Sequence, residues 1–194
     1  MKLVLASQSP RRKELLGRLG LEFTTKASQV DEEAFSAATP EELVKTLSRE
    51  KARWVAQRES EDAIVIGADT VVVLDGDVLG KPGSQAQARE MLRRLSGRVH
   101  QVYTGVSVCQ GDFTVTQAEA TQVRFRPLTE EEIHCYVRSG EPMDKAGAYG
   151  LQGLGALLVE GVEGDYTNVV GLPICRLGHI LLQFGIDCLA LAAR

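Results

Sequence analysis

Hydrophobic residues along this chain change between two spacings, which predicts an alternation of strands and helices. Continuous apolar runs at residues 3–6 and 63–67 predict buried strands, the second of them central. Residues 99–109 and 113–126 carry Thr, Val, Tyr and Phe in partial alternation, which predicts two long strands. The predicted extended segments are residues 3–6, 21–30, 63–67, 70–74, 78–79, 99–109, 113–126 and 156–162. Asp75-Gly76 is a strong hairpin turn sequence and predicts that the segments on either side of it pair.

Helix starts are marked by Ser or Thr followed by proline or acidic residues. Ser9-Pro10 puts a capping side chain before proline at the first helical position. The segments that begin at Thr39, Ser84 and Thr129 resemble capping boxes. The predicted helices are residues 10–20, 40–58, 84–97, 129–138 and 173–184, and the glycine-rich residues 146–155 are predicted as a loop.

The order of these elements predicts an α/β fold. Strands and helices alternate, but inserted hairpins favour a mixed sheet flanked by helices over a purely parallel one. The sequence contains no internal repeat, low-complexity tract or linker, so we expect one domain over residues 1–194, with two lobes around a cleft.

Composition and charge narrow the class of protein. Hydrophobic residues make up 44% and charged residues 25%, as in soluble globular proteins. The net charge of −4 argues against a broad nucleic-acid-binding surface. No apolar run approaches the ~18 residues of a membrane span, and the run at residues 3–6 is shorter than a signal-peptide core of about 7 to 15 residues. We therefore expect a cytoplasmic protein. Its four cysteines form no CxxC pair, so we expect neither disulfides nor a zinc cluster.

The segment Ser7-Gln8-Ser9-Pro10-Arg11-Arg12 is the first candidate for chemistry. It joins a predicted strand to a helix N-terminus, where backbone N–H groups and the helix dipole attract anions. Arg11 and Arg12 stand at the positive end of that helix, where acidic residues are normally favoured, and a bound phosphate would compensate their charge. The alternative is a Ser-Pro cap with solvated arginines.

Asp69 ends the predicted central strand, at a loop formed by Gly67-Ala68-Asp69-Thr70. This is the usual place for a metal ligand or a general base in α/β enzymes, although an aspartate that bonds its own turn is an equal alternative. Lys81, between Gly80 and Pro82, can point an ammonium at phosphate from a stiff loop, or it is simply solvated.

A last loop, residues 144–153, contains Lys145 and several glycines that permit close backbone approach to a ligand. Gln152 in this loop offers both a donor and an acceptor, as reading a base edge requires. A flexible surface loop is the alternative. Glu32 and Lys51 are weaker candidates, because a charge run is normally solvated and a lysine on a helix flank is normally exposed.

These segments, in this order, resemble the Maf family of nucleotide pyrophosphatases, which is associated with septum formation. The matching stretches are residues 5–12, 30–32, 49–52, 67–70, 80–82, 95–97, 103–105, 144–150, 152–153 and 168–173. One such motif would be weak, but the ordered series over most of the chain is specific. The resemblance implies an elongated α/β fold related to inosine triphosphate pyrophosphatases, with the nucleotide in a central cleft.

The resemblance also implies a reaction and assigns residues to it. A divalent metal such as Mg²⁺ or Mn²⁺ would assist hydrolysis between the α and β phosphates, with Asp69 as proton acceptor. On this basis we hypothesise that Asp69, together with Glu32, holds the metal. Ser7, Ser9, Arg12, Lys51 and Lys81 would bind phosphate, and Lys145 is a further candidate. Arg11, Thr70 and Gln152 match the trio of the dTTP/UTP branch, whereas relatives that act on 7-methyl-GTP carry an acidic residue at the position of Gln152.

Two alternatives remain from the sequence alone. One is a purine-editing pyrophosphatase that acts on inosine or xanthosine triphosphate, and the other is a non-enzymatic nucleotide-binding regulator of septation. The sequence ranks neither the pyrimidine nucleotides nor the metals, and it leaves open whether the role is nucleotide-pool cleaning or division arrest. A homodimer is compatible with it, because two-fold dimers are the commonest assemblies.

Overall fold

The computed structural model describes residues 2–193, and the chain forms two compact units. Unit 1 comprises the described residues up to Asp69 together with Thr104–Glu119 and those from Gly171 onward. Unit 2 comprises Thr70–Tyr103 and Ala120–Val170. The two units are described separately below, and both a single domain and a cleft between two lobes remain predictions.

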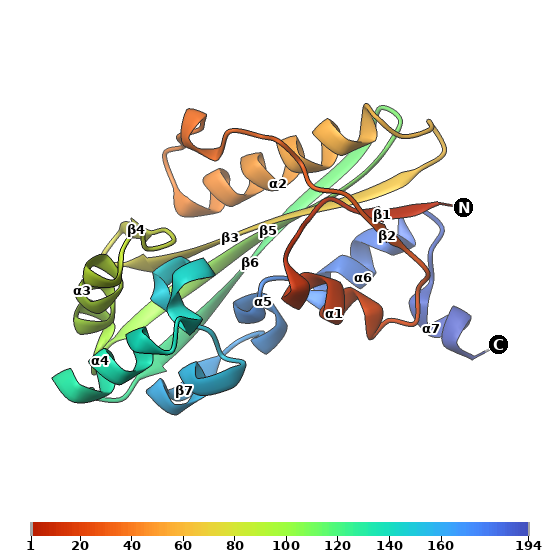
Figure 1. Ribbon diagram of the computed structural model, residues 1–194. Coiled ribbons are helices and arrows are strands. Elements are labelled where there is room, and N and C mark those ends of the chain that lie inside the picture. Colours follow the sequence, from red (N-terminus) through yellow and green to blue (C-terminus); the bar gives the residue numbers. More distant parts are fainter. Residues whose placement is uncertain (1, 194) are drawn as a thin grey trace. The chain divides into compact units, whose positions relative to one another are not determined.

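The predicted mixed α/β architecture is confirmed (Figure 1). In the described part of the chain, seven strands form one sheet in the order β2-β1-β3-β5-β6-β7, and β4 pairs with β3 outside this path. Strand β1 is parallel to both β2 and β3, whereas β4 is antiparallel to β3 and β7 is antiparallel to β6. The strands are β1 Leu3–Leu5, β2 Thr24–Thr25, β3 Ile64–Leu74, β4 Asp77–Leu79, β5 Val99–Gln110, β6 Phe113–Phe125 and β7 Val159–Glu163.

The helices begin close to the predicted caps. The α-helices are α1 Pro10–Gly17, α2 Pro40–Ala56, α3 Gln85–Leu95, α4 Glu130–Arg138, α5 Tyr166–Val170, α6 Ile174–Leu182 and α7 Cys188–Ala192. Short 3-10 turns are η1 Glu32–Ala34, η2 Glu141–Asp144, η3 Ala146–Ala148 and η4 Gly153–Leu158. None of the helices within residues 2–193 is both long and apolar enough to cross a bilayer.

Local capping chemistry explains the helix starts. The side chains of Ser9, Thr39 and Ser84 each accept a hydrogen bond from a backbone N–H of the first turn, and Thr129 and Glu132 form a complete capping box. Helix ends were predicted less well, because α1 stops at Gly17 and not at Gly20. The five-residue helices α5 and α7 were not predicted.

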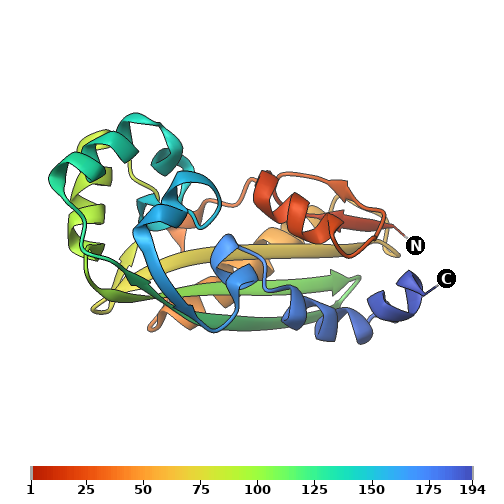
Figure 2. The ribbon, with the colours of Figure 1, turned by 90° about the horizontal axis from the view of Figure 1, so that it is seen from below.

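In unit 1, helices cover the strands on both sides. Helix α2 lies along one side of the unit 1 parts of β3 and β5, and α1 and α6 lie on the opposite side (Figures 1 and 2). Ala52 and Val55 of α2 pack with Val4 of β1, Val65 of β3 and Cys109 of β5, all of them buried. The apolar stripe of α2 is therefore what attaches this helix to the sheet.

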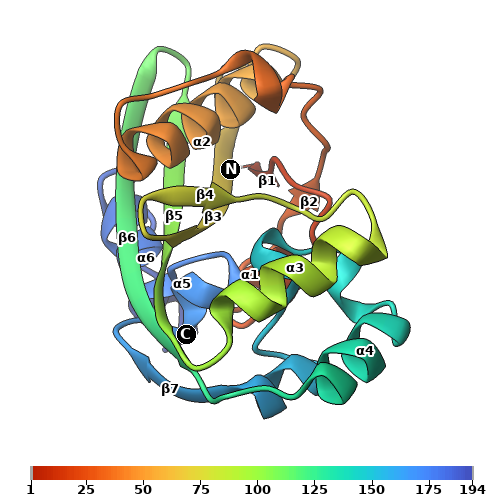
Figure 3. The same cartoon turned by 90° about the vertical axis from the view of Figure 1, so that its left-hand side faces the viewer.

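Unit 2 has its own apolar core. Helices α3 and α4 lie side by side over it (Figure 3). Its buried residues come from β3, β4, β5, β6, α3 and α4 and from the turns around residue 149. The hairpin turn predicted at Asp75-Gly76 is confirmed, because both residues have positive φ and connect the antiparallel strands β3 and β4.

An aromatic cluster with a titratable member lies in this core. His100 is 2% exposed, its Nε2 atom lies 2.7 Å from the hydroxyl of Tyr149, and its ring meets those of Phe125 and Tyr149 edge to face. Burial lowers the pKa of His100 to about 4. The imidazole is therefore neutral in the folded protein at pH values where it would be charged in the unfolded chain.

We expect this histidine to make stability depend on pH. Its folded pKa lies below its unfolded value of 6.5, so its contribution is present above pH 6.5 and is lost as the pH falls toward 4. The free energy of unfolding should fall by about 1.4 kcal/mol per pH unit and by roughly 3 kcal/mol in total. Urea unfolding at pH 7, 5.5 and 4.5 measures it. His100→Gln, which keeps an acceptor for Tyr149, should lose this dependence, and equal curves for wild type and variant would contradict the expectation.

A matched control comes from an exposed histidine of the same unit. His134 lies exposed on α4. His134→Gln should follow the wild-type pH dependence, which would assign the difference seen with His100→Gln to burial of that one ring.

Candidate active site

In unit 1, two carboxylates contact the ammonium nitrogen of Lys51, and these three side chains form the Lys51 cluster. The Lys51 Nζ atom lies 2.6 Å from an oxygen of Asp69 and 2.7 Å from an oxygen of Glu32. Lys51 and Asp69 are 7% and 5% exposed, whereas Glu32 is exposed at the edge of the cluster. A buried ion pair of this kind is held only where its geometry is good, because each charge has lost its water.

Asp69 is not at the end of a strand, which corrects the sequence prediction. It lies inside β3, which continues without a break from Ile64 to Leu74. The apolar run that predicted this strand ended at Gly67, and glycine usually weakens strands. Here glycine serves a different purpose, which is the close packing of a helix.

Two glycines allow α2 to lie almost directly on the sheet. A Cβ atom at Gly67 would lie 2.3 Å from the Ser48 carbonyl oxygen and 2.7 Å from the Ala52 nitrogen. A Cβ atom at Gly105 of β5 would lie 2.1 Å from the Val44 carbonyl oxygen. Since only glycine fits at both positions, the backbone of α2 approaches β3 closely, and Lys51 on this helix reaches Asp69 on the strand.

The segment from Ser7 to Arg12 forms the predicted junction of strand and helix. Ser7 Oγ accepts a hydrogen bond from the Ser9 backbone N–H at 3.1 Å, and Ser9 Oγ caps α1 by accepting from the Arg12 N–H at 3.4 Å. Arg12 Nε donates to the Gly171 carbonyl oxygen at 2.7 Å, which joins this segment to the residues before α6. No acidic residue occupies the first turn of α1.

The carboxylates of the Lys51 cluster interact electrostatically with Arg12. Burial lowers the pKa of the half-buried Arg12 guanidinium, while the carboxylates of Asp69 and Glu32 act in the opposite direction and Arg11 in the same direction as burial. The carboxylates of Asp69 and Glu32 are therefore near enough to Arg12 to interact with its charge.

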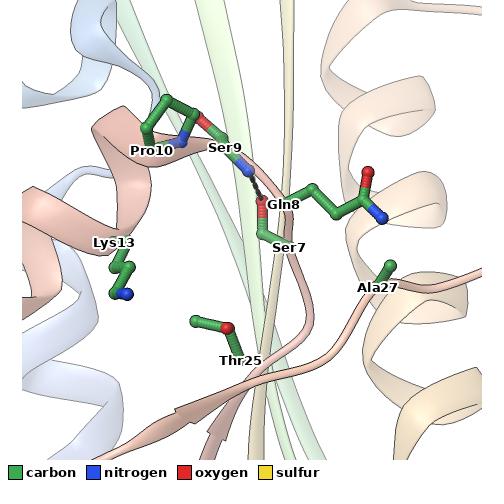
Figure 4. A pocket seen from close by; sticks show the side chains of 7 residues that line it. All are labelled: Ser7, Gln8, Ser9, Pro10, Lys13, Thr25 and Ala27. Carbon is green, nitrogen blue, oxygen red and sulfur yellow. Dashed lines mark hydrogen bonds between the residues drawn. The ribbon is translucent and has the colours of Figure 1, made fainter.

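A pocket of about 430 Å³ opens beside the same segment (Figure 4). Its lining residues are Ser7, Gln8, Ser9, Pro10, Lys13, Thr25 and Ala27. Sequence analysis had named Ser7 and Ser9 as phosphate ligands but had assigned no role to Thr25, which comes from β2. Lys13, in the first turn of α1, also lines the pocket. Neither Arg11 nor Arg12 belongs to the lining of this pocket.

The remaining candidates lie in unit 2. The Gly147 backbone N–H donates to the Gly80 carbonyl oxygen at 3.1 Å, so the loop of Lys81 contacts the loop that leads to Gln152. Lys145 Nζ is 2.6 Å from a carboxylate oxygen of Asp144 and 2.5 Å from the Glu141 carbonyl oxygen. Lys145 is therefore held by groups of its own loop.

The predicted site residues are thus divided between the units. Unit 1 contains Ser7, Ser9, Arg11, Arg12, Glu32, Lys51 and Asp69, and unit 2 contains Thr70, Lys81, Lys145 and Gln152. Within unit 1, Glu32, Lys51 and Asp69 are in contact. The roles assigned to all of these residues, including the trio Arg11, Thr70 and Gln152, remain predictions.

The carboxylates of Asp69 and Glu32 are oxygen ligands of the kind that Mg²⁺ takes, and in the structure both contact the Lys51 ammonium. No group of three or more His, Cys, Asp or Glu residues in the described part of the chain is arranged to hold a metal. Two carboxylates, with water and substrate phosphates as the other ligands, are a usual arrangement for Mg²⁺.

A protein-family model matches nearly the whole chain. The model described as "Maf-like protein" matches residues 2–184. This chain belongs to the Maf family. The residues that the model matches include all those that form the Lys51 cluster, the Ser7–Arg12 segment and the Gln152 loop.

Curated Maf relatives are similar over nearly the whole chain. A protein of Moorella thermoacetica named "dTTP/UTP pyrophosphatase" is 57% identical over 189 residues, which cover 96% of each chain. Proteins with the same name from Symbiobacterium thermophilum and Bacillus cereus (strain AH820) are 55% and 52% identical, over 95% and 96% of this chain and 94% and 97% of their own.

Solved structures give only distant similarities. A nucleoside-triphosphatase / dITP/XTP pyrophosphatase from Mycobacterium abscessus matches all of this chain and 97% of its own at a TM-score of 0.45 and 15% identity. A HAM1 protein from Coxiella burnetii matches 64% of this chain and 73% of its own at 0.44 and 16%. These values are too low to decide fold or function.

Proposed function

We propose that this Maf-family chain is a nucleoside triphosphate pyrophosphatase that hydrolyses dTTP, UTP and related modified pyrimidine nucleotides to the monophosphate and pyrophosphate. The observation that carries the proposal is the buried contact of Asp69 with Lys51, which Glu32 shares. Such a cluster combines a carboxylate base with charges that attract a metal and phosphate. The names of the relatives at 52–57% identity support the choice of reaction and substrates.

Each residue of unit 1 then has a chemical task. Asp69 accepts the proton of the water that attacks the α-phosphorus, and Lys51 holds the Asp69 carboxylate in place for that transfer. Arg12 and the hydroxyls of Ser7 and Ser9 bind phosphate oxygens at the start of α1. Position and charge account for most of the catalysis, as is general for phosphoryl transfer.

A divalent metal forms part of the proposal. Asp69 and Glu32 would hold it, and its charge would neutralise the phosphate oxygens and the leaving pyrophosphate. Mg²⁺ and Mn²⁺ both suit carboxylate oxygens. A cytoplasmic location, a homodimer, and a role in pool cleaning or division arrest are further parts of the proposal that wait for experiment.

Pyrophosphate release from a panel of dTTP, UTP, CTP, ITP and 7-methyl-GTP, each with Mg²⁺ or Mn²⁺, tests the proposal. Release mainly from dTTP and UTP is the expected result. Release mainly from ITP would move the protein to the purine-editing class. Tight nucleotide binding without any release would instead favour a non-enzymatic regulator.

Base selectivity should depend on Gln152. We expect Gln152→Glu to lower the ratio of kcat/KM for UTP to that for 7-methyl-GTP by at least about 10-fold. A carboxylate cannot donate to uracil but suits a positively charged methylated guanine. Gln85→Glu, at an exposed position in the first turn of α3, is the matched control and should leave the ratio unchanged. The same ratio in Gln152→Glu and wild type would show that Gln152 does not read the base.

A further inference from the structure

The turn that follows Gln152 has no cap of its own. Gln152 is the N-cap residue of η4, but its side chain makes no capping hydrogen bond. The next residue, Gly153, has a φ of +83°, a conformation that favours glycine. The exposed N–H groups of this turn therefore need an acceptor from elsewhere in the chain.

Glu141 supplies that acceptor. Its carboxylate accepts the Leu154 N–H at 2.9 Å with one oxygen and the Gly155 N–H at 2.9 Å with the other. The Tyr136 hydroxyl donates to the same carboxylate at 3.0 Å. Three donors on one carboxylate fix its orientation, and charge-assisted bonds of this kind are stronger than neutral ones.

The packing around this carboxylate leaves little freedom. A Cβ atom at Gly153 would lie 2.7 Å from a Glu141 carboxylate oxygen. At Gly155 it would lie 2.2 Å from the Gly150 carbonyl oxygen and 2.7 Å from the Tyr136 hydroxyl. The backbone on both sides of Gln152 therefore packs closely, with Gly153 against the Glu141 carboxylate and Gly155 against Gly150 and the Tyr136 hydroxyl.

The electrostatics favour a charged Glu141. Burial alone would raise its pKa, but hydrogen bonds from Gly155, Leu154 and Tyr136 outweigh that effect, and the pKa lies below its ordinary value. Lys145 strengthens the arrangement, because its ammonium bonds the Glu141 carbonyl oxygen while its side chain packs under Gly150.

We propose that Glu141 is a positioning residue that fixes the side-chain amide of Gln152 for base recognition and thereby sets nucleobase selectivity. The proposal rests on the function proposed above, in which Gln152 reads the pyrimidine. Glu141 acts through the backbone of residues 153–155 and does not itself touch the substrate. Its loss should affect discrimination between bases more than the chemical step.

The test uses Glu141→Gln and, as a milder change, Tyr136→Phe, with kcat and KM measured for UTP and 7-methyl-GTP. Glu141→Gln should raise KM for UTP about 10-fold with kcat within about threefold of wild type, and should lower the UTP to 7-methyl-GTP ratio of kcat/KM about 10-fold. Tyr136→Phe should shift the ratio in the same direction by a smaller factor. Glu130→Gln, which removes a surface pair with Arg93 in unit 2, should leave the ratio unchanged.

Backbone amide exchange provides a readout that needs no substrate. The Leu154 and Gly155 amides should exchange faster in Glu141→Gln than in wild type, while amides in α3 keep their wild-type rates. If Glu141→Gln does not fold, Tyr136→Phe decides by the same two readouts.

The outcomes separate this inference from the proposed function. A wild-type enzyme without preference for UTP over 7-methyl-GTP overturns the proposed function, and with it this inference. A selective wild type, together with folded variants whose ratio is unchanged or whose rates fall equally for both nucleotides, overturns this inference alone. Unchanged exchange of Leu154 and Gly155 also overturns it.

Discussion

Replacing Asp69 by asparagine should lower the turnover of dTTP and UTP by at least about 100-fold, the low end for the loss of a general base. The side chain keeps its shape, so nucleotide binding should change less than turnover. The substitution also removes one of the two carboxylates that face Lys51. Because neither substrate nor metal can replace the lost proton acceptor, the reduction in turnover should persist at saturating substrate and at raised concentrations of Mg²⁺ or Mn²⁺.

The control for this prediction is Asp77→Asn. Asp77 is an ion-paired aspartate, 2.7 Å from Arg94, but it is exposed on the surface of unit 2. This variant should retain wild-type turnover. Steady-state pyrophosphate release, with thermal unfolding as a check on folding, measures both variants. Turnover of Asp69→Asn close to that of wild type would remove Asp69 from the mechanism.

A single methyl group at Gly67 should strongly destabilise the fold of unit 1. A Cβ atom there would lie within 2.3 to 2.9 Å of three atoms of α2, two of which are backbone atoms that cannot rotate away. The helix must shift, and we expect Gly67→Ala to lower the free energy of unfolding by about 3 kcal/mol, at the upper end for overpacking. Because the same helix carries Lys51, activity should fall by at least about 10-fold in the fraction that folds.

Gly178→Ala is the matched control. A Cβ atom at Gly178 in α6 has no heavy atom within 4 Å, and alanine favours helix, so this variant should be as stable as wild type or up to about 1 kcal/mol more stable. Urea unfolding measures both. If Gly67→Ala unfolds at the wild-type urea concentration, α2 does not rest on β3 as described.

The sequence was most informative where structure depends on neighbouring residues. The helix starts at Ser9, Thr39, Ser84 and Thr129 follow from side chains that bond N–H groups two or three positions on, so they were predicted correctly. The Asp75-Gly76 turn is equally local. Helices α5 and α7 were missed because five residues are too few to show a helical period, although Asp165 before α5 and Asp187 before α7 accept backbone N–H bonds as caps do.

The site was harder to predict because it depends on contacts between distant segments. Lys51 was expected to be exposed on a helix flank, yet the close approach of α2 at Gly67 buries it against Asp69. The resemblance to the Maf family named Glu32, Lys51 and Asp69, but no spacing in the sequence indicated that they share one contact. Glu141 was missed altogether, because its partners lie 13 and 14 residues away and its role is visible only in hydrogen bonds to backbone.

The central claim is that water attacks the α-phosphorus of a pyrimidine nucleotide and releases pyrophosphate. Hydrolysis of dTTP in ¹⁸O-labelled water, with mass spectrometry of the products, tests it most directly. We predict dTMP and pyrophosphate in equal amounts, with the label in dTMP. Label in the pyrophosphate, or the formation of dTDP and phosphate, would contradict the account.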